Sequence, residues 1–392
     1  MSGQLEEPLK NQVTKPGDIA TIEEAIAEYK AGRMVIVMDD EDRENEGDLC
    51  MAAEKVTAEA INFMATEGCG LICLPVTGQK LAALGLPMMV AENTAPLGTA
   101  FTVSIDARHG NKSGVSASDR ARTILAAVQE NAQPSDLKTP GHIFPLRARD
   151  GGVLVRTGQT EAAVDLARLA GLRPAGVICE IMNKDGTMAR LPELRVFAAE
   201  HGLKLITIAD LIQYRLRHDS LVHRVAEARL DSRYGGEFRA IVYRSDVDGG
   251  EHLALVKGDI SPDQPTLVRA HAEYLPGDVF ASTKRNTADL LHRSMEKIAD
   301  EGCGVILYLK REHGSEMLEP RGDAAATDGA NDESGPSTMS PARLKDFREY
   351  GIGAQILRDL GLGKIRLISN YQRRLVNLPG YGLEIVEHVP LD

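Results

Sequence analysis

The sequence lacks long apolar runs, a positive net charge and CxxC pairs of cysteines. No apolar run approaches the ~18–20 residues that cross a lipid bilayer. The opening segment MSGQLEEPLKNQVTKPGD is polar and contains acids, unlike a signal or transit peptide. The formal net charge of −12 argues against nonspecific nucleic-acid binding, which needs a basic surface. We therefore expect a cytoplasmic protein without a membrane or nucleic-acid partner.

The number and spacing of the cysteines argue against a disulfide framework and against a structural zinc site. The chain contains five cysteines, an odd number, and none forms a CxxC pair. A disulfide framework and a structural zinc site are therefore not expected. We expect free, buried thiols instead. The cysteines are Cys50, Cys69, Cys73, Cys179 and Cys303.

The length predicts two domains. A chain of 392 residues exceeds one ordinary hydrophobic core and suits two domains of roughly 150–200 residues. A polar and basic stretch over Arg215–Leu230 marks the boundary, which gives domains over 1–210 and 220–392. The segment Arg321–Ser340 has no Val, Ile, Leu or aromatic residue, so we expect it to be a loop without a core of its own.

Both halves mix strand and helix patterns. Thr21 and Glu24 form a capping box at the start of a helix that ends before Gly32, and Thr160 is expected to cap another helix. The sequence therefore predicts an α+β protein: a mixed-sheet α/β domain followed by a second α/β domain. Strands are expected at 34–38, 71–74, 153–155, 177–181, 203–206, 238–244, 253–256, 305–309 and 365–368. Helices are expected at 22–29, 57–66, 118–130, 161–169, 208–216 and 341–360.

A strongly acidic run follows the first predicted strand. Asp39–Asp48 reads DDEDRENEGD, with seven acids and one arginine among ten residues. Such a run is often a solvated turn. Here it follows a wholly apolar strand, where sites often lie, and its carboxylates and guanidinium together suit a hard divalent cation and a phosphate. The run therefore favours a site for a phosphorylated small molecule.

The motif DEDRENEGD resembles the 3,4-dihydroxy-2-butanone-4-phosphate synthase family. The resemblance covers about residues 15–210, and its motifs occur in the family's order. The further motifs are EGCG at 67–70, VSIDA at 103–107, GVSASDRARTI at 114–124, PGHIFPL at 140–146, TEAAVDLARLAGL at 160–172 and GVICEIMN at 176–183.

The resemblance implies a lyase of riboflavin biosynthesis. The family converts D-ribulose 5-phosphate to L-3,4-dihydroxy-2-butanone 4-phosphate and formate through an enediol, and requires a divalent metal. Such chemistry needs a cation to stabilise enediolate charge and positioned acids and bases to move protons. The resemblance implies Mg²⁺ or Mn²⁺ as the cofactor and a homodimer as the assembly.

The resemblance also assigns site residues. His142 and Glu180 are the expected acid/base groups, and an unpaired carboxylate in the apolar strand around Glu180 would otherwise be costly. Glu44 is the expected metal-ligating carboxylate. The α-helix after residue 159 is expected to offer its N-terminus to the phosphate. The expected substrate-binding residues are Arg43, Glu44, Asp48, Arg156, Thr157, Gly158, Gln159, Thr160 and Glu180.

One metal-ligand position departs from the family pattern. The family usually reads RxGHTEA, whereas 156–162 reads RTGQTEA, so Gln159 replaces a histidine. Its carbonyl oxygen suits Mg²⁺ but is a weaker donor to transition metals. Either the site is rich in oxygen and prefers Mg²⁺, with Glu44 and Gln159 as ligands, or the metal site is weakened. The stretch GNKSGVSASDR also has Lys112 and Ser113 where small hydroxyl residues are usual.

The second half resembles GTP cyclohydrolase II without its zinc ligands. The matching motifs are LPGDVFAS at 275–282, DFREYGIGAQILRDLGL at 346–362 and GYGLEIVEHVPL at 380–391. The three zinc-binding cysteines of that family are replaced by Tyr274, Arg285 and Thr287, which are no substitute for thiolates. The family's QEGRG stretch becomes REHGS at 311–315, and His271, His292 and His313 lack ligand spacing. We expect no zinc and no GTP hydrolysis.

Three functions remain as alternatives. The first is a synthase fused to a degenerate second domain, and it is the one that the intact motifs favour. The second is a binding or regulatory pseudoenzyme impaired at Gln159. The third is a bifunctional enzyme that also acts on GTP.

Overall fold

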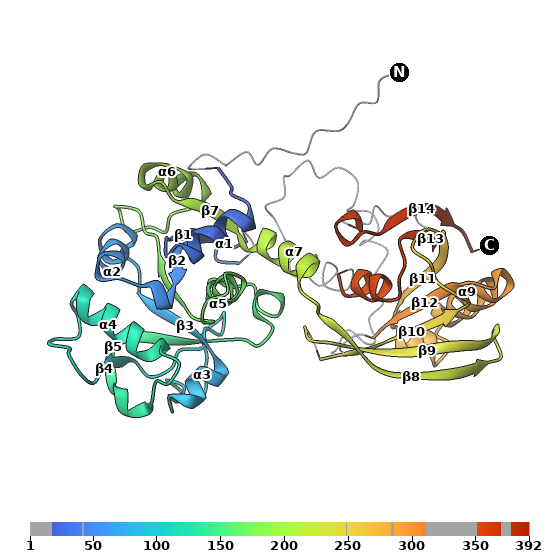
Figure 1. Ribbon diagram of the computed structural model, residues 1–392, viewed down its shortest axis with the longest axis horizontal. Coiled ribbons are helices and arrows are strands. Elements are labelled where there is room, and N and C mark those ends of the chain that lie inside the picture. Colours follow the sequence, from blue (N-terminus) through green and yellow to red (C-terminus); the bar gives the residue numbers. More distant parts are fainter. Residues whose placement is uncertain are drawn as a thin grey trace, which may run out of the picture. The chain divides into compact units, whose positions relative to one another are not determined.

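The computed structural model describes residues 18–40, 43–247, 249–283, 286–310, 351–369 and 378–391, without the side chains of 379 and 380. The chain divides into two compact units, with the boundary between Tyr214 and Arg215 (Figure 1). Predictions for Arg285, 311–315, His313 and 321–340 lie outside the described residues.

A seven-stranded mixed sheet forms the centre of the first unit. Its strand order is β4-β5-β3-β6-β2-β1-β7, and only the β5/β3 and β1/β7 pairs are parallel. The core strands are buried on both faces because helices cover both, which explains their continuous apolar runs. The strands are β1 Val35–Met38, β2 Gly47–Ala52, β3 Cys73–Thr77, β4 Ile105–Ala107, β5 Leu137–Ala148, β6 Gly176–Glu180 and β7 Lys204–Thr207.

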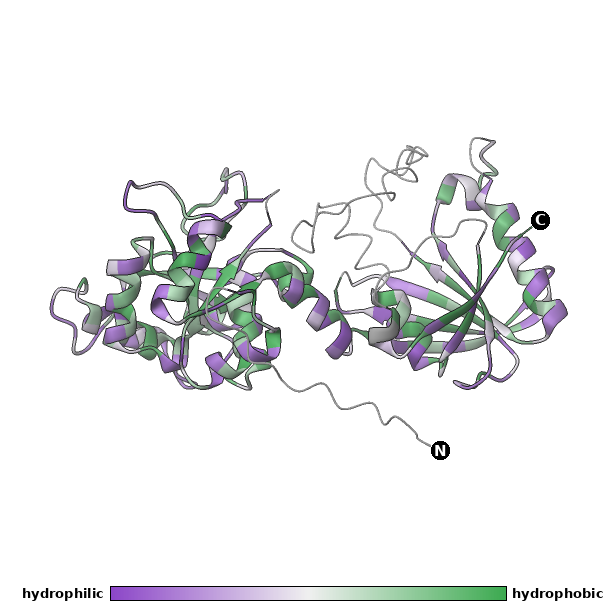
Figure 2. Ribbon diagram, turned by 90° about the horizontal axis from the view of Figure 1, so that it is seen from above, coloured by the Kyte–Doolittle hydropathy of each residue, from purple (hydrophilic) through white to green (hydrophobic). Residues whose placement is uncertain are grey.

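Helices α1 and α5 pack on one face of this sheet, and α2, α4 and α6 pack on the other (Figure 1). Hydrophobic residues of α2, α4 and α6 form one core with inward residues such as Ile36, Leu49 and Val177. Figure 2 shows that hydrophobic residues run along the central strands. The helices are α1 Ile22–Lys30, α2 Ala58–Phe63, α3 Gly78–Ala83, α4 Ala117–Val128, α5 Gln159–Leu169 and α6 Leu191–His201. The boundary between the units falls within the next helix, α7 Ile208–His218.

The mixed α/β fold predicted from the sequence is confirmed, but two local predictions are wrong. Residues 153–155 do not form a strand, because left-handed Gly151 and Gly152 turn the chain into a 3-10 helix over Gly152–Leu154. Thr160 does not cap α5. The N-cap is Gly158, without a side-chain hydrogen bond, and Thr160 is buried in the first turn.

A second seven-stranded mixed sheet organises the second unit. Its order is β14-β13-β11-β12-β10-β9-β8, and β11 lies in its parallel part, between β13 and β12. Residues 351–359 are helical, which confirms the described part of the helix predicted over 341–360. The strands are β8 Val222–Ser232, β9 Gly236–Ser245, β10 Glu251–Lys257, β11 Thr266–Ala272, β12 Gly304–Leu309, β13 Lys364–Ile368 and β14 Glu384–Val389. The short helix α8 spans Leu275–Asp278, and α9 spans Thr287–Glu301.

The cysteines are all free, and their burial differs from the expectation. Cys50, Cys73 and Cys179 are buried, as expected, but Cys69 is exposed and Cys303 is half-buried. Cys69 follows a π-helical turn in a left-handed conformation, which turns it outward. No helix in the described part of the chain is long and apolar enough to span a membrane.

Candidate active site

The acidic loop connects β1 to β2 at one edge of the first sheet. The two strands pair as far as Met38 and Gly47, so residues 39, 40 and 43–46 lie directly beyond the sheet. The fully buried carboxylate of Asp39 organises this loop. It accepts hydrogen bonds from the backbone N–H groups of Glu44 at 3.2 Å and Glu46 at 2.8 Å, and from Arg43 Nη1 at 2.5 Å. Asp39 thus fixes the loop from which the expected site residues project.

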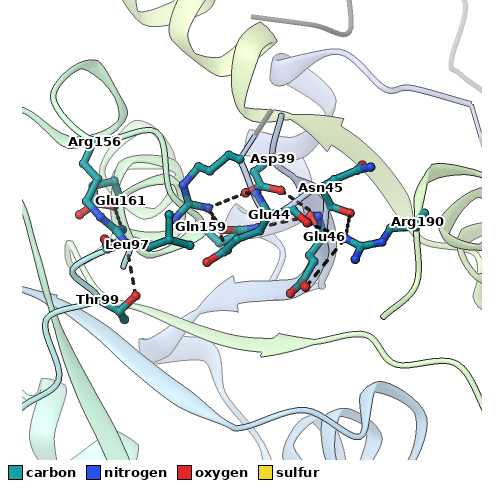
Figure 3. A network of polar contacts seen from close by, with 11 residues as sticks. Asp39, Glu44, Asn45, Glu46, Leu97, Thr99, Arg156, Gln159, Glu161 and Arg190 are labelled. Carbon is teal, nitrogen blue, oxygen red and sulfur yellow. Dashed lines mark hydrogen bonds and ion pairs between the residues drawn. The ribbon is translucent and has the colours of Figure 1, made fainter. Parts of the chain in front are cut away.

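A second arginine holds the other side of the loop. Arg190, the N-cap residue of α6, donates through Nη1 to the carbonyl oxygens of Glu44 and Asn45, both at 2.5 Å (Figure 3). The same atom lies 3.8 Å from Glu46 Oε1. Asn45 adopts a positive φ of 56°, which aims these consecutive carbonyls at the guanidinium. The acidic loop is therefore held between Asp39 below it and Arg190 beside it.

Arg43, Glu44 and Gln159 meet above the loop. Arg43 Nη1 donates to Glu44 Oε2 at 2.9 Å and to Gln159 Oε1 at 3.0 Å. The amide nitrogen of Gln159 donates to the carbonyl of Glu46 at 3.3 Å. Both ends of the Gln159 amide therefore contact the acidic loop, and they join the start of α5 to residues more than a hundred positions earlier. The structure brings these three predicted site residues together.

Asp48 and Glu180 are neighbours across the sheet. They are register partners in the antiparallel β2/β6 pair. Burial raises the pKa of Asp48 well above its usual range, and the charge of Glu180 raises it further. Glu180 Oε2 accepts a hydrogen bond from the backbone N–H of Leu71 at 2.7 Å. Gly70 is required beside it, because a Cβ there would lie 2.5 Å from Glu180 Oε2.

His142 is paired with a buried carboxylate that the sequence reading did not select. Its Nδ1 lies 2.9 Å from Asp106 Oδ2, and its backbone N–H donates to Asp106 Oδ1 at 3.2 Å. A proton on Nδ1 that is held by Asp106 leaves Nε2 as the exposed basic nitrogen. Gly114, at φ +84°, packs so closely that a Cβ would lie 2.5 Å from His142 Nδ1.

Sheet topology brings His142 and Glu180 to the same edge. β5 and β3 are parallel with Phe144 opposite Cys73, so His142 lies level with Leu71. The backbone N–H of Leu71 contacts Glu180 on the next strand. Two strand spacings separate the two residues by roughly 10 Å. Because β1 ends, β2 begins and β6 ends at this edge, the acidic loop, Asp48, Glu180 and His142 all lie along it.

The start of α5 supplies the remaining predicted residues. Arg156 Nη1 forms an ion pair with the buried Glu161 at 2.7 Å, and Nη2 lies 3.4 Å from Thr99 Oγ1 (Figure 3). A Cβ at Gly158 would lie 2.4 Å from Arg156 Nη1, so a larger residue there would displace this guanidinium. Thr157 is only half-buried beside them. Arg156 therefore has an internal carboxylate partner and lies close to the helix N-terminus.

The donor set fits a hard cation that is bound mainly by oxygen. Asp39, Glu44 and Gln159 all direct an oxygen at the cationic Nη1 of Arg43. Mg²⁺ is usually held by one or two carboxylates and completes its shell with water and substrate oxygens. Glu44 and the amide oxygen of Gln159 are the residues that would hold such an ion. Among the described residues, no group of three or more His, Cys, Asp or Glu side chains forms a metal site.

The residues at the zinc positions of the second unit do not fit zinc. Asp278 accepts hydrogen bonds from His271, Tyr308, the backbone N–H of Tyr274 and the hydroxyl of Thr287. Burial raises the pKa of Asp278, but these hydrogen bonds outweigh it and hold the pKa well below its usual range. His292 instead stacks on the ring of Tyr234 at 3.7 Å. Tyr274, through its backbone N–H, and Thr287, through its hydroxyl, thus donate hydrogen bonds to Asp278, and neither residue supplies a thiolate.

Comparisons with known proteins agree with the two-unit division. Residues 23–214 match the 3,4-dihydroxy-2-butanone 4-phosphate synthase family, and residues 223–390 match the GTP cyclohydrolase II family. The riboflavin biosynthesis protein RibBA of Aquifex aeolicus is 53% identical over 95% of this chain and 92% of its own length.

Two solved structures are also similar. RibBX of A. baumannii, a two-domain 3,4-dihydroxy-2-butanone 4-phosphate synthase, is 41% identical with a TM-score of 0.73 over 95% of this chain and all of its own. A 3,4-dihydroxy-2-butanone 4-phosphate synthase in complex with two magnesium ions is 45% identical with a TM-score of 0.50, and the match covers 51% of this chain and 99% of that one. This chain therefore belongs to the riboflavin biosynthesis family that joins a 3,4-dihydroxy-2-butanone 4-phosphate synthase domain to a GTP cyclohydrolase II domain.

Proposed function

We propose that the first unit converts D-ribulose 5-phosphate to L-3,4-dihydroxy-2-butanone 4-phosphate and formate with Mg²⁺ or Mn²⁺. The observation that carries this proposal is the edge of the first sheet, where the acidic loop, Asp48, Glu180 and His142 gather beside the start of α5. The family match, and the magnesium ions of the similar synthase, support the same reaction.

The chain's own residues supply binding and proton transfer in this proposal. His142 removes and returns substrate protons through Nε2, while Asp106 holds the imidazole orientation. Glu180, oriented by the Leu71 N–H, is the second acid/base group, and Asp48 contacts the sugar hydroxyls. Glu44 and Gln159 would hold a divalent ion, which would supply stabilisation of negative charge on adjacent substrate oxygens.

The phosphate of the substrate is proposed to bind at the start of α5. Arg156 and Arg43 bring positive charge to this helix terminus, whose backbone N–H groups favour anions. Thr157, Gly158 and Thr160 line the same turn. The two ends of the substrate then bind at different places. The phosphate lies at the start of α5, and the reacting carbons lie between Glu180 and His142.

Formate release from D-ribulose 5-phosphate tests this function. The purified protein should release formate with Mg²⁺ and with Mn²⁺. Glu44→Gln should lower kcat more than about 100-fold, because it removes the charged metal ligand. Glu200→Gln, on the exposed face of α6, is the matched control and should retain wild-type turnover. A folded wild-type protein that releases no formate with either ion would favour the pseudoenzyme alternative.

We further propose that the second unit does not hydrolyse GTP and binds no zinc. The Asp278 cluster supports this proposal, because Tyr274 and Thr287 are engaged there without thiolates. The description of the similar RibBX as a two-domain synthase supports it as well. The bifunctional alternative remains the competing function, since residues 223–390 match the cyclohydrolase family. We also propose that the protein is cytoplasmic and forms a homodimer. Sedimentation of the purified protein would test the homodimer.

A further inference from the structure

The guanidinium of Arg43 lies at the point where three site oxygens converge. Its Nη1 is 2.5 Å from Asp39 Oδ2, 2.9 Å from Glu44 Oε2 and 3.0 Å from Gln159 Oε1. Asp39 is fully buried, and only 14% of the Arg43 side chain is exposed. One positive charge, on the acidic loop itself, therefore sits inside a shell of carboxylate and amide oxygens.

A divalent ion needs two of the same oxygens. Under the proposed function, Glu44 and Gln159 are its protein ligands. Gln159 has a single carbonyl oxygen, and its amide nitrogen already donates to Glu46. If the Gln159 amide were flipped, its NH₂ group and not its oxygen would face the ion. A guanidinium within about 3 Å of both ligand oxygens would also repel the ion, because like charges a few ångströms apart repel strongly in a partly buried site.

We propose, on the basis of the proposed function, that Arg43 and the divalent ion are alternative occupants of this oxygen shell. Binding of the ion displaces the guanidinium from Glu44 and Gln159, while Asp39 remains available as its partner. The displaced guanidinium is then available to the substrate phosphate. Arg43 therefore lowers metal affinity in the absence of substrate and links metal binding to substrate binding.

Direct titration of Mn²⁺ tests the competition without any turnover. Binding is measured by electron paramagnetic resonance of free Mn²⁺ in the absence of substrate, for the wild type, Arg43→Gln and Arg43→Met. Both neutral variants should bind Mn²⁺ on the order of tenfold more tightly or better. Arg43→Lys keeps the charge and should stay closer to the wild type. Arg173→Met removes an equal charge before β6, at the far end of the strand from Glu180, and should leave Mn²⁺ affinity unchanged.

Thermal unfolding provides a second readout and a check on folding. Without Arg43, the buried Asp39 carboxylate loses its cationic partner, so saturating Mn²⁺ should raise the Tm of Arg43→Gln and Arg43→Met more than that of the wild type. Arg43→Gln can still donate to Asp39, and it keeps the test valid if Arg43→Met does not fold.

The failures of the two proposals are distinguishable. If both neutral variants bind Mn²⁺ no more tightly than a wild type that releases formate, the competition is refuted and the lyase function stands. If the wild type releases no formate while the neutral variants bind Mn²⁺ more tightly, the competition stands and the lyase function is refuted. If none of the proteins binds Mn²⁺, the oxygen shell is not a metal site and the competition is refuted.

Discussion

At the scale of single residues, the site depends on carboxylates that act through another side chain. Asp106 holds His142 at two points, and Asp39 holds the loop that carries Glu44. Neither is expected to touch the substrate. Asp106 positions His142 and Asp39 positions Glu44, so these two acids are positioning residues. Substitution of either buried carboxylate is expected to be costly, because its loss would leave several N–H groups without an acceptor.

Replacement of Asp106 tests this positioning. In Asp106→Asn, an amide N–H can face His142 Nδ1 and favour the tautomer with its proton on Nε2. We expect kcat for formate release to fall on the order of 100-fold, with little change in KM. Asp185→Asn, in an exposed turn, is the control. A kcat within threefold of the wild type would show that Asp106 does not set the imidazole state.

Sequence motifs predict the candidate site residues that lie within a continuous motif, and they do not point to residues that only the fold brings near. Arg43, Glu44 and Glu180 lie in recognisable motifs. Asp39 belongs to the acidic run, but its burial below the loop is not visible in the pattern. The partner of His142 lies 36 residues earlier, in VSIDA, and only the β4/β5 pairing joins the two.

At the scale of secondary-structure elements, strands were predicted from short apolar runs, and in the case of β9 from an alternating pattern, whereas several strands without such a pattern were missed. β1, β6 and β7 are short apolar runs and were found. β2 begins within the acidic motif, and β5 contains two prolines, so neither shows a strand pattern. β8 was taken as part of a polar linker, because almost all of its residues are exposed. Pairing with a neighbour, which no local pattern records, makes these segments strands.

The Asp278 cluster joins four elements of the second unit. It connects β11 through His271, α9 through Thr287 and β12 through Tyr308 to the end of α8. We expect Asp278→Asn to lower the free energy of unfolding of this unit by about 2–3 kcal/mol, because a buried, charge-assisted acceptor is weakened. Thermal unfolding followed by circular dichroism measures this loss, and Asp300→Asn on the exposed face of α9 is the control.

The effect of Asp278→Asn should depend on pH. The folded pKa of Asp278 lies below its usual value, so its ionised form stabilises the folded state above a pH of about 4. As the pH falls below that value, the unfolded state takes up the proton first and the stabilisation declines. The Tm difference between wild type and variant should therefore be largest near neutral pH and shrink in acid. A difference that stays constant from pH 7 to pH 3 would contradict this account.

At the scale of the whole molecule, we expect the first unit to need a divalent ion such as Mg²⁺ and the second unit to bind no zinc. After treatment with a chelator, Mg²⁺ alone should restore formate release from D-ribulose 5-phosphate. Elemental analysis should find less than about one zinc per ten chains, since the second unit offers no thiolate at 274 or 287. The same preparation should consume no GTP by chromatography, with or without added zinc. GTP consumption that scales with zinc loading would establish the bifunctional alternative.

The position of β7 has a consequence for synthesis on the ribosome. β7 is the last strand of the first sheet, and it pairs with β1, the first strand in the chain. The nascent chain can complete this sheet only after residue 207 has emerged. At about 5–20 residues per second, translation of 208–392 takes roughly 10–40 s. That interval is long compared with the folding of most domains, so the growing chain can carry a finished first unit while the second is still being made.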